Sequence, residues 1–236
     1  MLWVVHFIMS KPISKEELKQ PDSFVLFFDQ LFTKIQKNIK ILWVSLIIIA
    51  IATTAFVVYQ QKQKHMNELA ANAYAATMEK ISTENIFTKE GWESFITDAT
   101  AFLNTYPSAS MAPQMQLAKA KALIHVEKYA EAQALFDQAK EKLPHPYQLL
   151  AFEGKAVALA FEEKYNESLW VWKLLTDTED NPFLDFHMWN LGLTYEKLGQ
   201  KEEALGVYQR LVDDLKDSPY VISASKRVQI LQSQGS

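Results

Sequence analysis

Residues 191–212 read LGLTYEKLGQKEEALGVYQRLV, and two earlier stretches follow the same plan at intervals of 36 residues. The second half of the plan begins with Lys201-Glu202-Glu203-Ala204 here, with Tyr165-Asn166-Glu167-Ser168 one interval earlier, and with Tyr129-Ala130-Glu131-Ala132 before that. A repeat of this length is typical of a stacked helical array, in which neighbouring units bury each other's apolar faces. The chain is therefore predicted to be all-α, and to bind along a concave surface rather than to catalyse a reaction.

Two kinds of side chain recur at fixed places and indicate how the units pack. Small residues stand where two helices of a pair would cross: Ala120, Ala156 and Gly192 in the first helices, Ala132, Ser168 and Ala204 in the second. Four residues further on stand the rings of Phe136, Trp172 and Tyr208, which would fill the space toward the next pair. The recurring columns predict one continuous core.

The expected helix pairs are 113–126 with 129–142, 147–162 with 165–177, and 183–198 with 201–216. Breakers separate the pairs at Pro144, Pro146, Pro182 and Pro219. A final helix over 220–232 would cap the array, with Lys226 and Arg227 facing water. Upstream, a helix is expected over 91–104, after a polar connector at 82–90.

The order of these columns resembles the tetratricopeptide repeat, a helix–turn–helix unit of 34 residues. The last unit carries the resemblance best, through Leu191, Gly192, Tyr195, Gly199, Ala204, Tyr208 and then Pro219. The other two units depart from the pattern, because Lys119 and Lys155 stand where the family prefers an apolar residue. The period is also two residues longer. Another antiparallel helical solenoid is the alternative.

A charge-free stretch lies between Lys40 and Lys62. Its apolar core, residues 41–59, would be about 28 Å long as a helix, close to the roughly 30 Å of a bilayer's hydrocarbon layer. Trp43 and Tyr59 stand near its ends, where amphipathic rings prefer the membrane interface. The stretch predicts a single transmembrane helix. The alternative is a cleaved signal peptide, since Ala50-Ile51-Ala52 resembles a cleavage box.

The flanking segments complete the predicted organisation. Residues 1–22 form an amino-terminal tail, of which 1–8 are set aside as a misassigned start or added leader. Residues 23–40 form an amphipathic helix that lies at the membrane interface or packs on a partner. Residues 60–111 form a stalk and a first divergent helix pair. Residues 112–236 hold three repeats and the capping helix.

Charge is unevenly distributed along the chain. Residues 1–65 contain eight lysines and four acids, whereas the remainder has 16 basic and 24 acidic residues. This pattern indicates a basic amino end near anionic lipid and gives no nucleic-acid footprint. The favoured orientation has the amino end in the cytoplasm and the carboxy-terminal domain outside. The chain has no cysteine, which excludes disulfides, thiolate metal sites and a lipid-bearing cysteine.

The sequence contains no pattern typical of catalysis. No two of the five histidines stand three or four residues apart, so no helix presents a metal-binding pair. The six glycines are scattered and form no phosphate-binding loop. No catalytic, cofactor or metal site is predicted, and we expect the protein not to be an enzyme.

The first helix of each pair is expected to line a concave, largely apolar groove that takes extended or helical apolar segments of other proteins. The predicted lining residues are Leu117, Lys121 and Ile124 in the first unit, Leu150, Glu153, Val157 and Phe161 in the second, and Phe186, Trp189, Leu193 and Lys197 in the third.

The layout over residues 30–232 resembles one family more closely, the ancillary subunit of the bacterial SecYEG translocon. The resemblance rests on the short basic segment, the single span, the alanine-rich stalk of residues 69–78 and the divergent repeats. It implies an inner-membrane protein with a periplasmic array, whose partners are the translocon and a membrane-anchored periplasmic chaperone. The alternatives are a structural scaffold for envelope assembly or cofactor maturation, and a cytosol-facing targeting receptor.

Overall fold

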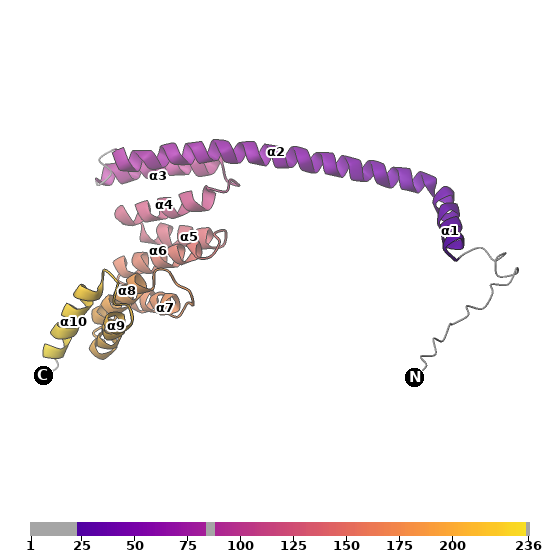
Figure 1. Cartoon of the computed structure of the whole chain (residues 1–236). Helices are drawn as coiled ribbons and strands as arrows, with labels where there is room; N and C mark the ends of the chain where they lie inside the picture. The colour runs from indigo at the N-terminus through magenta and orange to yellow at the C-terminus, as the bar shows by residue number, and fades with distance from the viewer. Residues whose placement is uncertain (1–22, 84–87, 235–236) are drawn as a thin grey trace, which may run out of the picture. The chain divides into compact units, whose positions relative to one another are not determined.

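The computed structural model describes residues 23–83 and 88–234, and within these ranges every regular element is an α-helix (Figure 1). The helices are α1 (Ser23–Lys37), α2 (Ile39–Thr83), α3 (Lys89–Thr105), α4 (Ala112–His125), α5 (Tyr129–Lys140), α6 (Tyr147–Phe161), α7 (Tyr165–Thr176), α8 (Leu184–Lys197), α9 (Lys201–Asp214) and α10 (Val221–Ser233). The predicted tail, residues 1–22, lies outside the described residues. Contacts divide the chain after Gln61 into two units, which are described separately.

The first unit holds α1 and the beginning of α2. The apolar side chains of α2 before Gln61 are exposed, and its hydroxyl groups bond within the helix: Ser45 donates to the carbonyl of Ile41 at 2.7 Å, and Thr54 to that of Ala50 at 2.8 Å. Among the described helices, α2 is the one long and apolar enough to cross a membrane by length and composition. It contains the predicted transmembrane segment, residues 41–59.

The second unit begins with the remainder of α2, which packs on α3. Ala70 of α2 is fully buried in a cluster with Phe95 and Phe102 of α3, and the ring of Tyr74 lies edge-on to that of Phe102, 6.3 Å between centroids. The predicted connector is shorter than expected, because α3 already begins at Lys89. The side chain of Thr88 caps it by accepting a hydrogen bond from the amide of Gly91 at 3.1 Å.

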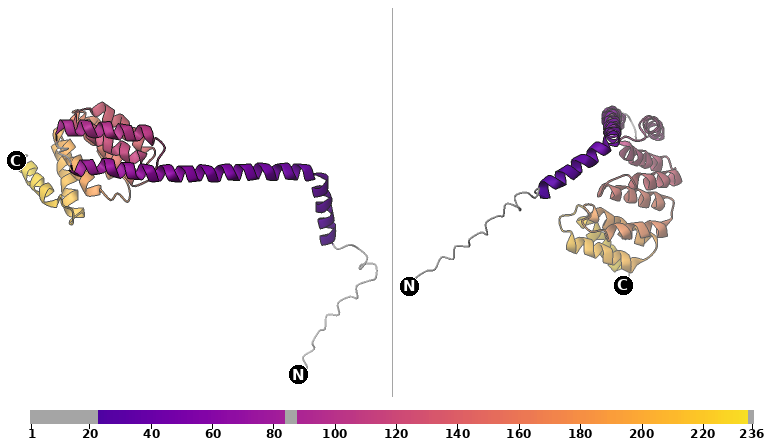
Figure 2. Two further views of the ribbon diagram at one scale, coloured as in Figure 1. Left: turned by 90° about the horizontal axis from the view of Figure 1, so that it is seen from above. Right: turned by 90° about the vertical axis from the view of Figure 1, so that its right-hand side faces the viewer.

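Three helical hairpins follow, α4 with α5, α6 with α7, and α8 with α9, and each helix contacts the next along the chain. Figures 1 and 2 show α3 to α9 stacked as successive layers. The helices lie where the sequence predicts them, with ends that differ by at most two residues from the expected ones. The predicted all-α array of helix pairs is confirmed.

The turn inside each hairpin has the same backbone conformation at equivalent positions. Glu127, Glu163 and Gly199 stand 36 residues apart and have φ of 63°, 61° and 71°. In each turn the amide of the following residue bonds to a carbonyl five residues back, for example Lys164 to Leu159 at 2.9 Å. This hydrogen bond is the signature of the Schellman motif, which ends a helix with a left-handed residue. Only the last turn carries the glycine that this conformation favours.

The predicted columns of small and large residues form the core of the array. Phe136, Trp172 and Tyr208 are at most 1% exposed. Two of the rings lie directly on glycine. A Cβ atom at Gly192 would stand 2.4 Å from the ring of Tyr208, and one at Gly154 would stand 2.2 Å from the ring of Phe136. The second contact joins α5 of one hairpin to α6 of the next, so the core runs through the hairpins without a break.

An ion-pair cluster also joins those two hairpins. Asp137 of α5 accepts hydrogen bonds from Lys140 at 3.0 Å and from Lys155 of α6 at 2.8 Å. Burial alone would raise the pKa of the Asp137 carboxyl, but the hydrogen bonds and charges of Lys155 and Lys140 outweigh it and hold the pKa below its ordinary value.

The array ends with α10, which packs on α9 through Ala224 and Leu231. The expectation that Lys226 and Arg227 both face water is correct for Lys226 and wrong for Arg227. The guanidinium of Arg227 donates to both carboxylate oxygens of Glu196 in α8, with its Nε at 2.8 Å. The hydroxyl of Tyr208 donates to the same carboxylate at 2.7 Å, so one acid joins α8, α9 and α10.

Candidate partner-binding groove

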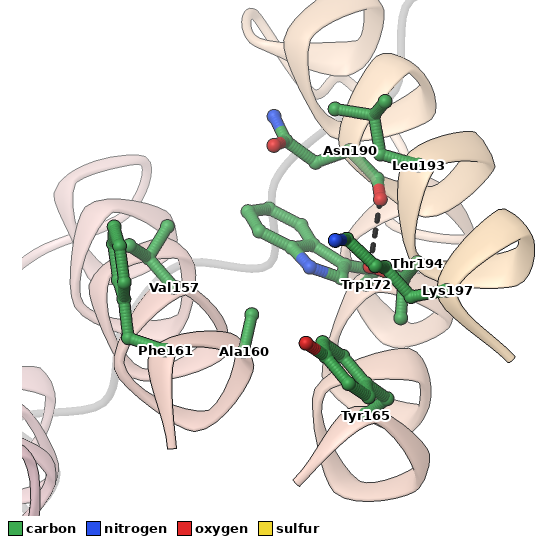
Figure 3. Close-up of a pocket in the computed structure, with 9 residues that line it drawn as sticks. All are labelled: Val157, Ala160, Phe161, Tyr165, Trp172, Asn190, Leu193, Thr194 and Lys197. Atoms are coloured by element: carbon green, nitrogen blue, oxygen red, sulfur yellow. Dashed lines mark hydrogen bonds between the residues drawn. The ribbon is translucent and has the colours of Figure 1, made fainter. Parts of the chain in front are cut away.

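A pocket of about 310 Å³ lies between the first helices of two successive hairpins, α6 and α8 (Figure 3). One wall is formed by α6, the opposite wall by α8, and residues of α7 lie at its base. Its lining residues are Val157, Ala160 and Phe161 from α6, Tyr165 and Trp172 from α7, and Asn190, Leu193, Thr194 and Lys197 from α8. We call this pocket the α6–α8 groove.

Helical periodicity explains how each wall is built. In α6, residues 160 and 161 stand three and four residues after Val157. In α8, residues 193 and 194 stand three and four residues after Asn190, and Lys197 follows one turn later. Residues at these intervals lie on one face of a helix. Trp172 is 1% exposed, so the base of the groove is part of the core and not a mobile surface side chain.

Two polar side chains of the groove are already engaged within α8. The hydroxyl of Thr194 donates to the carbonyl of Asn190 at 2.8 Å, the bond drawn in Figure 3. The side-chain amide of Asn190 donates to the carbonyl of Phe186 at 2.8 Å. The remaining surface is largely hydrocarbon and aromatic, with the ammonium of Lys197 at one wall. Such a surface favours an apolar ligand over a polar one.

Phe161 extends the groove toward the preceding hairpin. It is the last residue of α6, and its side chain is 60% exposed. The ring of Tyr129, at the start of α5, stacks on it with 6.0 Å between centroids and an interplanar angle of 6°. An aromatic pair held in this way at the surface is rigid and ready to cover an apolar partner.

The structure brings four of the eleven predicted lining residues together in the groove. They are Val157, Phe161, Leu193 and Lys197. Sequence reasoning missed five others, namely Ala160, Tyr165, Trp172, Asn190 and Thr194. Trp172 was expected in the core column, and it serves both roles.

The predicted residues of the first unit lie elsewhere. Leu117 is buried in the core and 8% exposed, which leaves little of it for a partner to touch. Ile124 is partly buried against the same core cluster, as is Leu150 at the start of the second unit. Lys121 is exposed on α4, outside the α6–α8 groove.

Two aromatic residues of the third unit are covered from inside the protein. Phe186 lies edge-on to Trp172, with 6.2 Å between the centroids. Trp189 packs on Tyr208 at 5.4 Å and stacks on Tyr220, just before α10, at 5.9 Å. These contacts hold the capping helix in place and leave both rings only partly exposed.

Glu153, another predicted lining residue, faces a buried histidine. Its carboxylate lies 3.5 Å from Nε2 of His187, which is fully buried. The other ring nitrogen, Nδ1, is 2.8 Å from the side-chain amide of Asn181, which also donates to the carbonyl of Leu175 at 2.7 Å. With Asn181 as donor, Nδ1 accepts the hydrogen bond, and Nε2 makes none in this structure. Asn181 and His187 fix the connection between α7 and α8, and Glu153 lies beside them rather than in the α6–α8 groove.

In residues 23–83 and 88–234, no three side chains of His, Asp or Glu come close enough to hold a metal ion.

Comparisons with known proteins agree with this architecture. The sequence model of a family described as tetratricopeptide repeat-like domain matches residues 35–230. No curated protein sequence matches the chain. Among solved structures, the chain is similar to a Podosopora anserina protein described as a kinesin light chain with nearly identical TPR-like repeats. The TM-score is 0.52 and the identity 15%, over 74% of this chain and 87% of that one.

A structure described as the MamA RS-1 ArsTM double mutant is also similar, with a TM-score of 0.50 and 16% identity over 72% of this chain and 98% of that one. At these identities both likenesses bear on the fold alone.

Proposed function

The chain belongs to the tetratricopeptide repeat-like domain family, and from this premise we propose that it is a membrane-anchored adaptor that captures apolar segments of other proteins in the α6–α8 groove. Repeat arrays of this kind present extended concave surfaces to partners rather than reactive groups. The observation that carries the proposal is the groove itself, an apolar trough with the 60% exposed ring of Phe161 at its edge.

The ligand class follows from the chemistry of the lining. An extended or helical segment with a bulky apolar side chain would cover Phe161 and contact Val157 and Leu193, while the hydrogen bonds of Asn190 and Thr194 within α8 stay intact. An acidic residue next to the apolar side chain would gain from Lys197. The groove is about the size of a few side chains, so each captured segment is short and exchange is expected to be fast.

The second part of the proposal is the anchor. Residues 41–59 of α2 cross the membrane, with Trp43 and Tyr59 near the two interfaces. Support comes from the exposed apolar surface of this segment and from the return of its hydroxyl groups to carbonyls of the same helix. The array would then be held close to the membrane, which raises its effective concentration near membrane-bound partners.

The third part concerns the partners. The layout that resembles the ancillary subunit of the SecYEG translocon supports exported polypeptides as clients, with the array on the outer side of the inner membrane and with the translocon and a periplasmic chaperone as neighbours. A fixed scaffold of envelope assembly or cofactor maturation and a cytosol-facing targeting receptor are the competing functions. Each gives a different result in the experiment below.

Photo-crosslinking in cells tests the proposal. A photoreactive amino acid in place of Phe161 or Leu193 is expected to capture newly exported chains, and the adducts should disappear when export is blocked. Trp170, which is 65% exposed on α7 and lies outside the α6–α8 groove, provides the matched control position. Adducts with one constant partner, unaffected by the block, would indicate a scaffold. Protease access to the array from the cytosolic side would indicate a receptor.

A binding measurement with the purified full chain gives the magnitude. Complete burial of a Phe side chain contributes roughly 1.5–3 kcal/mol, so the exposed three-fifths of Phe161 corresponds to about a tenfold loss of affinity in Phe161→Ala. Trp170→Ala removes an equally exposed ring elsewhere and should leave the affinity unchanged. Equal losses in both variants would mean that binding follows exposed aromatic area and not the groove.

A further inference from the structure

The short helix α1 carries a continuous apolar stripe that is exposed in the described part of the first unit, residues 23–61. Phe28, Leu31 and Ile35 follow one another at intervals of three and four residues, and further apolar residues widen the stripe on both sides. All are between 37% and 66% exposed: Phe24, Val25, Phe27, Phe28, Leu31, Phe32 and Ile35. The opposite face carries Asp29, Gln30, Thr33, Gln36 and Lys37, with Leu26 as its one apolar residue. In water, such a stripe would be a large unfavourable surface.

The junction between α1 and α2 is an elbow. α1 ends at Lys37, and Asn38 interrupts the helix: its backbone amide donates to the carbonyl of Ile35 at 3.1 Å, and its side-chain amide to that of Lys34 at 3.0 Å. Figures 1 and 2 show the ribbon changing direction there. A concavity of about 250 Å³ at the elbow is lined from both helices, by Leu31, Lys34, Ile35, Asn38, Ile41, Leu42 and Ser45.

The charges near the elbow are positive. Lys34, Lys37 and Lys40 lie within two turns of one another, and Asp29 is the one acid between Ser23 and Gln61. Lys34 lines the concavity, next to the apolar stripe. Lysines beside an apolar surface can extend their stems along it and hold the ammonium at the level of lipid phosphates.

We propose that α1 lies in the plane of an anionic membrane leaflet, with its apolar stripe among the acyl chains and with Lys34, Lys37 and Lys40 at lipid phosphates. Three observations favour lipid over a protein partner as the occupant. The stripe is continuous along the chain with the exposed apolar surface of α2. The elbow lets one helix lie flat while the next one crosses. The net positive charge complements anionic headgroups.

This inference rests on the proposed membrane anchor, and the experiment separates the two. The chain has no cysteine, so single cysteines in the full chain can carry nitroxide labels at chosen positions. Phe28→Cys and Leu31→Cys report on the stripe, while Gln30→Cys and Thr33→Cys report on the opposite face. The labelled proteins are reconstituted in nanodiscs of phosphatidylcholine, with or without phosphatidylglycerol. Collision with oxygen, which concentrates in acyl chains, and with a water-soluble nickel complex is then measured.

In anionic nanodiscs, the labels at Phe28 and Leu31 are expected to collide with oxygen and to be shielded from nickel, and those at Gln30 and Thr33 to show the reverse. Nickel access at all four positions would overturn the inference while leaving the anchor intact. Shielding of the stripe from both reagents would mean that it packs on a second copy of the chain, and would also overturn it. If the protein does not remain with the nanodiscs at all, the anchor itself fails.

Charge variants test the anionic component. Each lysine near an anionic surface contributes about fivefold to binding. Lys34→Gln with Lys37→Gln should therefore shift the docking equilibrium of α1 toward water on the order of thirtyfold, and pure phosphatidylcholine should have a similar effect. The control pair Lys62→Gln with Lys64→Gln removes the same charge beyond the apolar segment and should change nothing. Equal docking in both lipids, or equal effects of the two pairs, would overturn the role of anionic lipid.

Discussion

Replacement of Gly154 by alanine in α6 is predicted to destabilise the array, although alanine is the better helix former. Helix propensity alone would stabilise the variant by about 1 kcal/mol. The new Cβ atom, however, would stand 2.2, 2.3 and 2.8 Å from three ring carbons of Phe136. An ordinary carbon contact is about 3.5 Å or longer, so the ring would have to retreat by more than about 1 Å. Phe136 is 1% exposed and has no free space to enter.

Overpacking of a tight core typically lowers the free energy of unfolding by about 1–3 kcal/mol. Because the new Cβ atom would contact three carbons of a buried ring, we expect a loss near the upper end of this range. The net expectation is a loss of about 2 kcal/mol. It can be measured by urea unfolding of the full chain in mild detergent, followed by far-ultraviolet circular dichroism. The apolar part of α2 should stay helical in the micelle and contribute only a constant baseline.

Gly206 in α9 is the matched control. It is exposed, and a Cβ atom there would meet nothing within 4 Å. Gly206→Ala should therefore stabilise the array by about 1 kcal/mol. Phe136→Leu should recover part of the loss in the Gly154→Ala background, with a coupling energy of about 1–3 kcal/mol. If Gly154→Ala were as stabilising as Gly206→Ala, the ring would not lie on Gly154, and the continuous core through successive hairpins would be refuted.

Further changes test other contacts. Glu163→Gly should raise the urea midpoint, since a non-glycine residue at its φ of 61° costs about 1 kcal/mol, and a lower midpoint would contradict the turn. Asp137→Asn should cost about 1 kcal/mol or less because the carboxylate is partly exposed. The pKa of Asp137 is lowered in the fold. Its contribution to the free energy of unfolding is therefore complete above the unfolded pKa of about 4 and is lost as the pH falls through the folded pKa. The stabilities of the variant and the native protein should converge in acid. Burial raises the pKa of Tyr208; stability should therefore decline as the pH rises beyond about 10, and ultraviolet titration should show this phenol ionising only on unfolding. Arg227→Met, which leaves the carboxylate of Glu196 short of one partner, should speed hydrogen exchange in α10 about fivefold, with no change in α4.

The helix pairs could be predicted because their signals are local and repeated. The interval of 36 residues predicts equivalent positions, and the small and large columns predict which of them meet. The left-handed turn could be read only in the last unit, where Gly199 marks it. Glu127 and Glu163 have the same left-handed conformation, but they are not glycine, so the sequence does not indicate it. In those two turns the packing of the flanking helices determines the backbone against the local preference.

Contacts between hairpins were harder to predict than contacts within them. The positions 36 residues before and after Gly154 are Ala118 and Asn190, so glycine does not recur there. The close approach of Phe136 to Gly154 therefore leaves no repeated pattern in the sequence. The pair of Arg227 with Glu196 joins residues 31 apart. Charge patterns along one helix reveal partners three or four residues away and not partners on another helix. Such contacts depend on how the helices are placed in space, and this placement cannot be predicted from the pattern of one sequence.

Counting from the small-residue columns finds part of the lining of the α6–α8 groove, and Trp189, near the end of the array, is not among the residues that line it. In the middle of a solenoid, a first helix is flanked on both sides, and its exposed stripe can be counted from the small-residue column, as for Val157 and Phe161. At the end, the capping helix turns back over the last hairpin, and Tyr220 covers Trp189. Trp189 is therefore a packing residue, although Leu193 and Lys197 further along the same helix line the α6–α8 groove. Truncation before Tyr220 should uncover Trp189 and lengthen the groove, at the expense of stability.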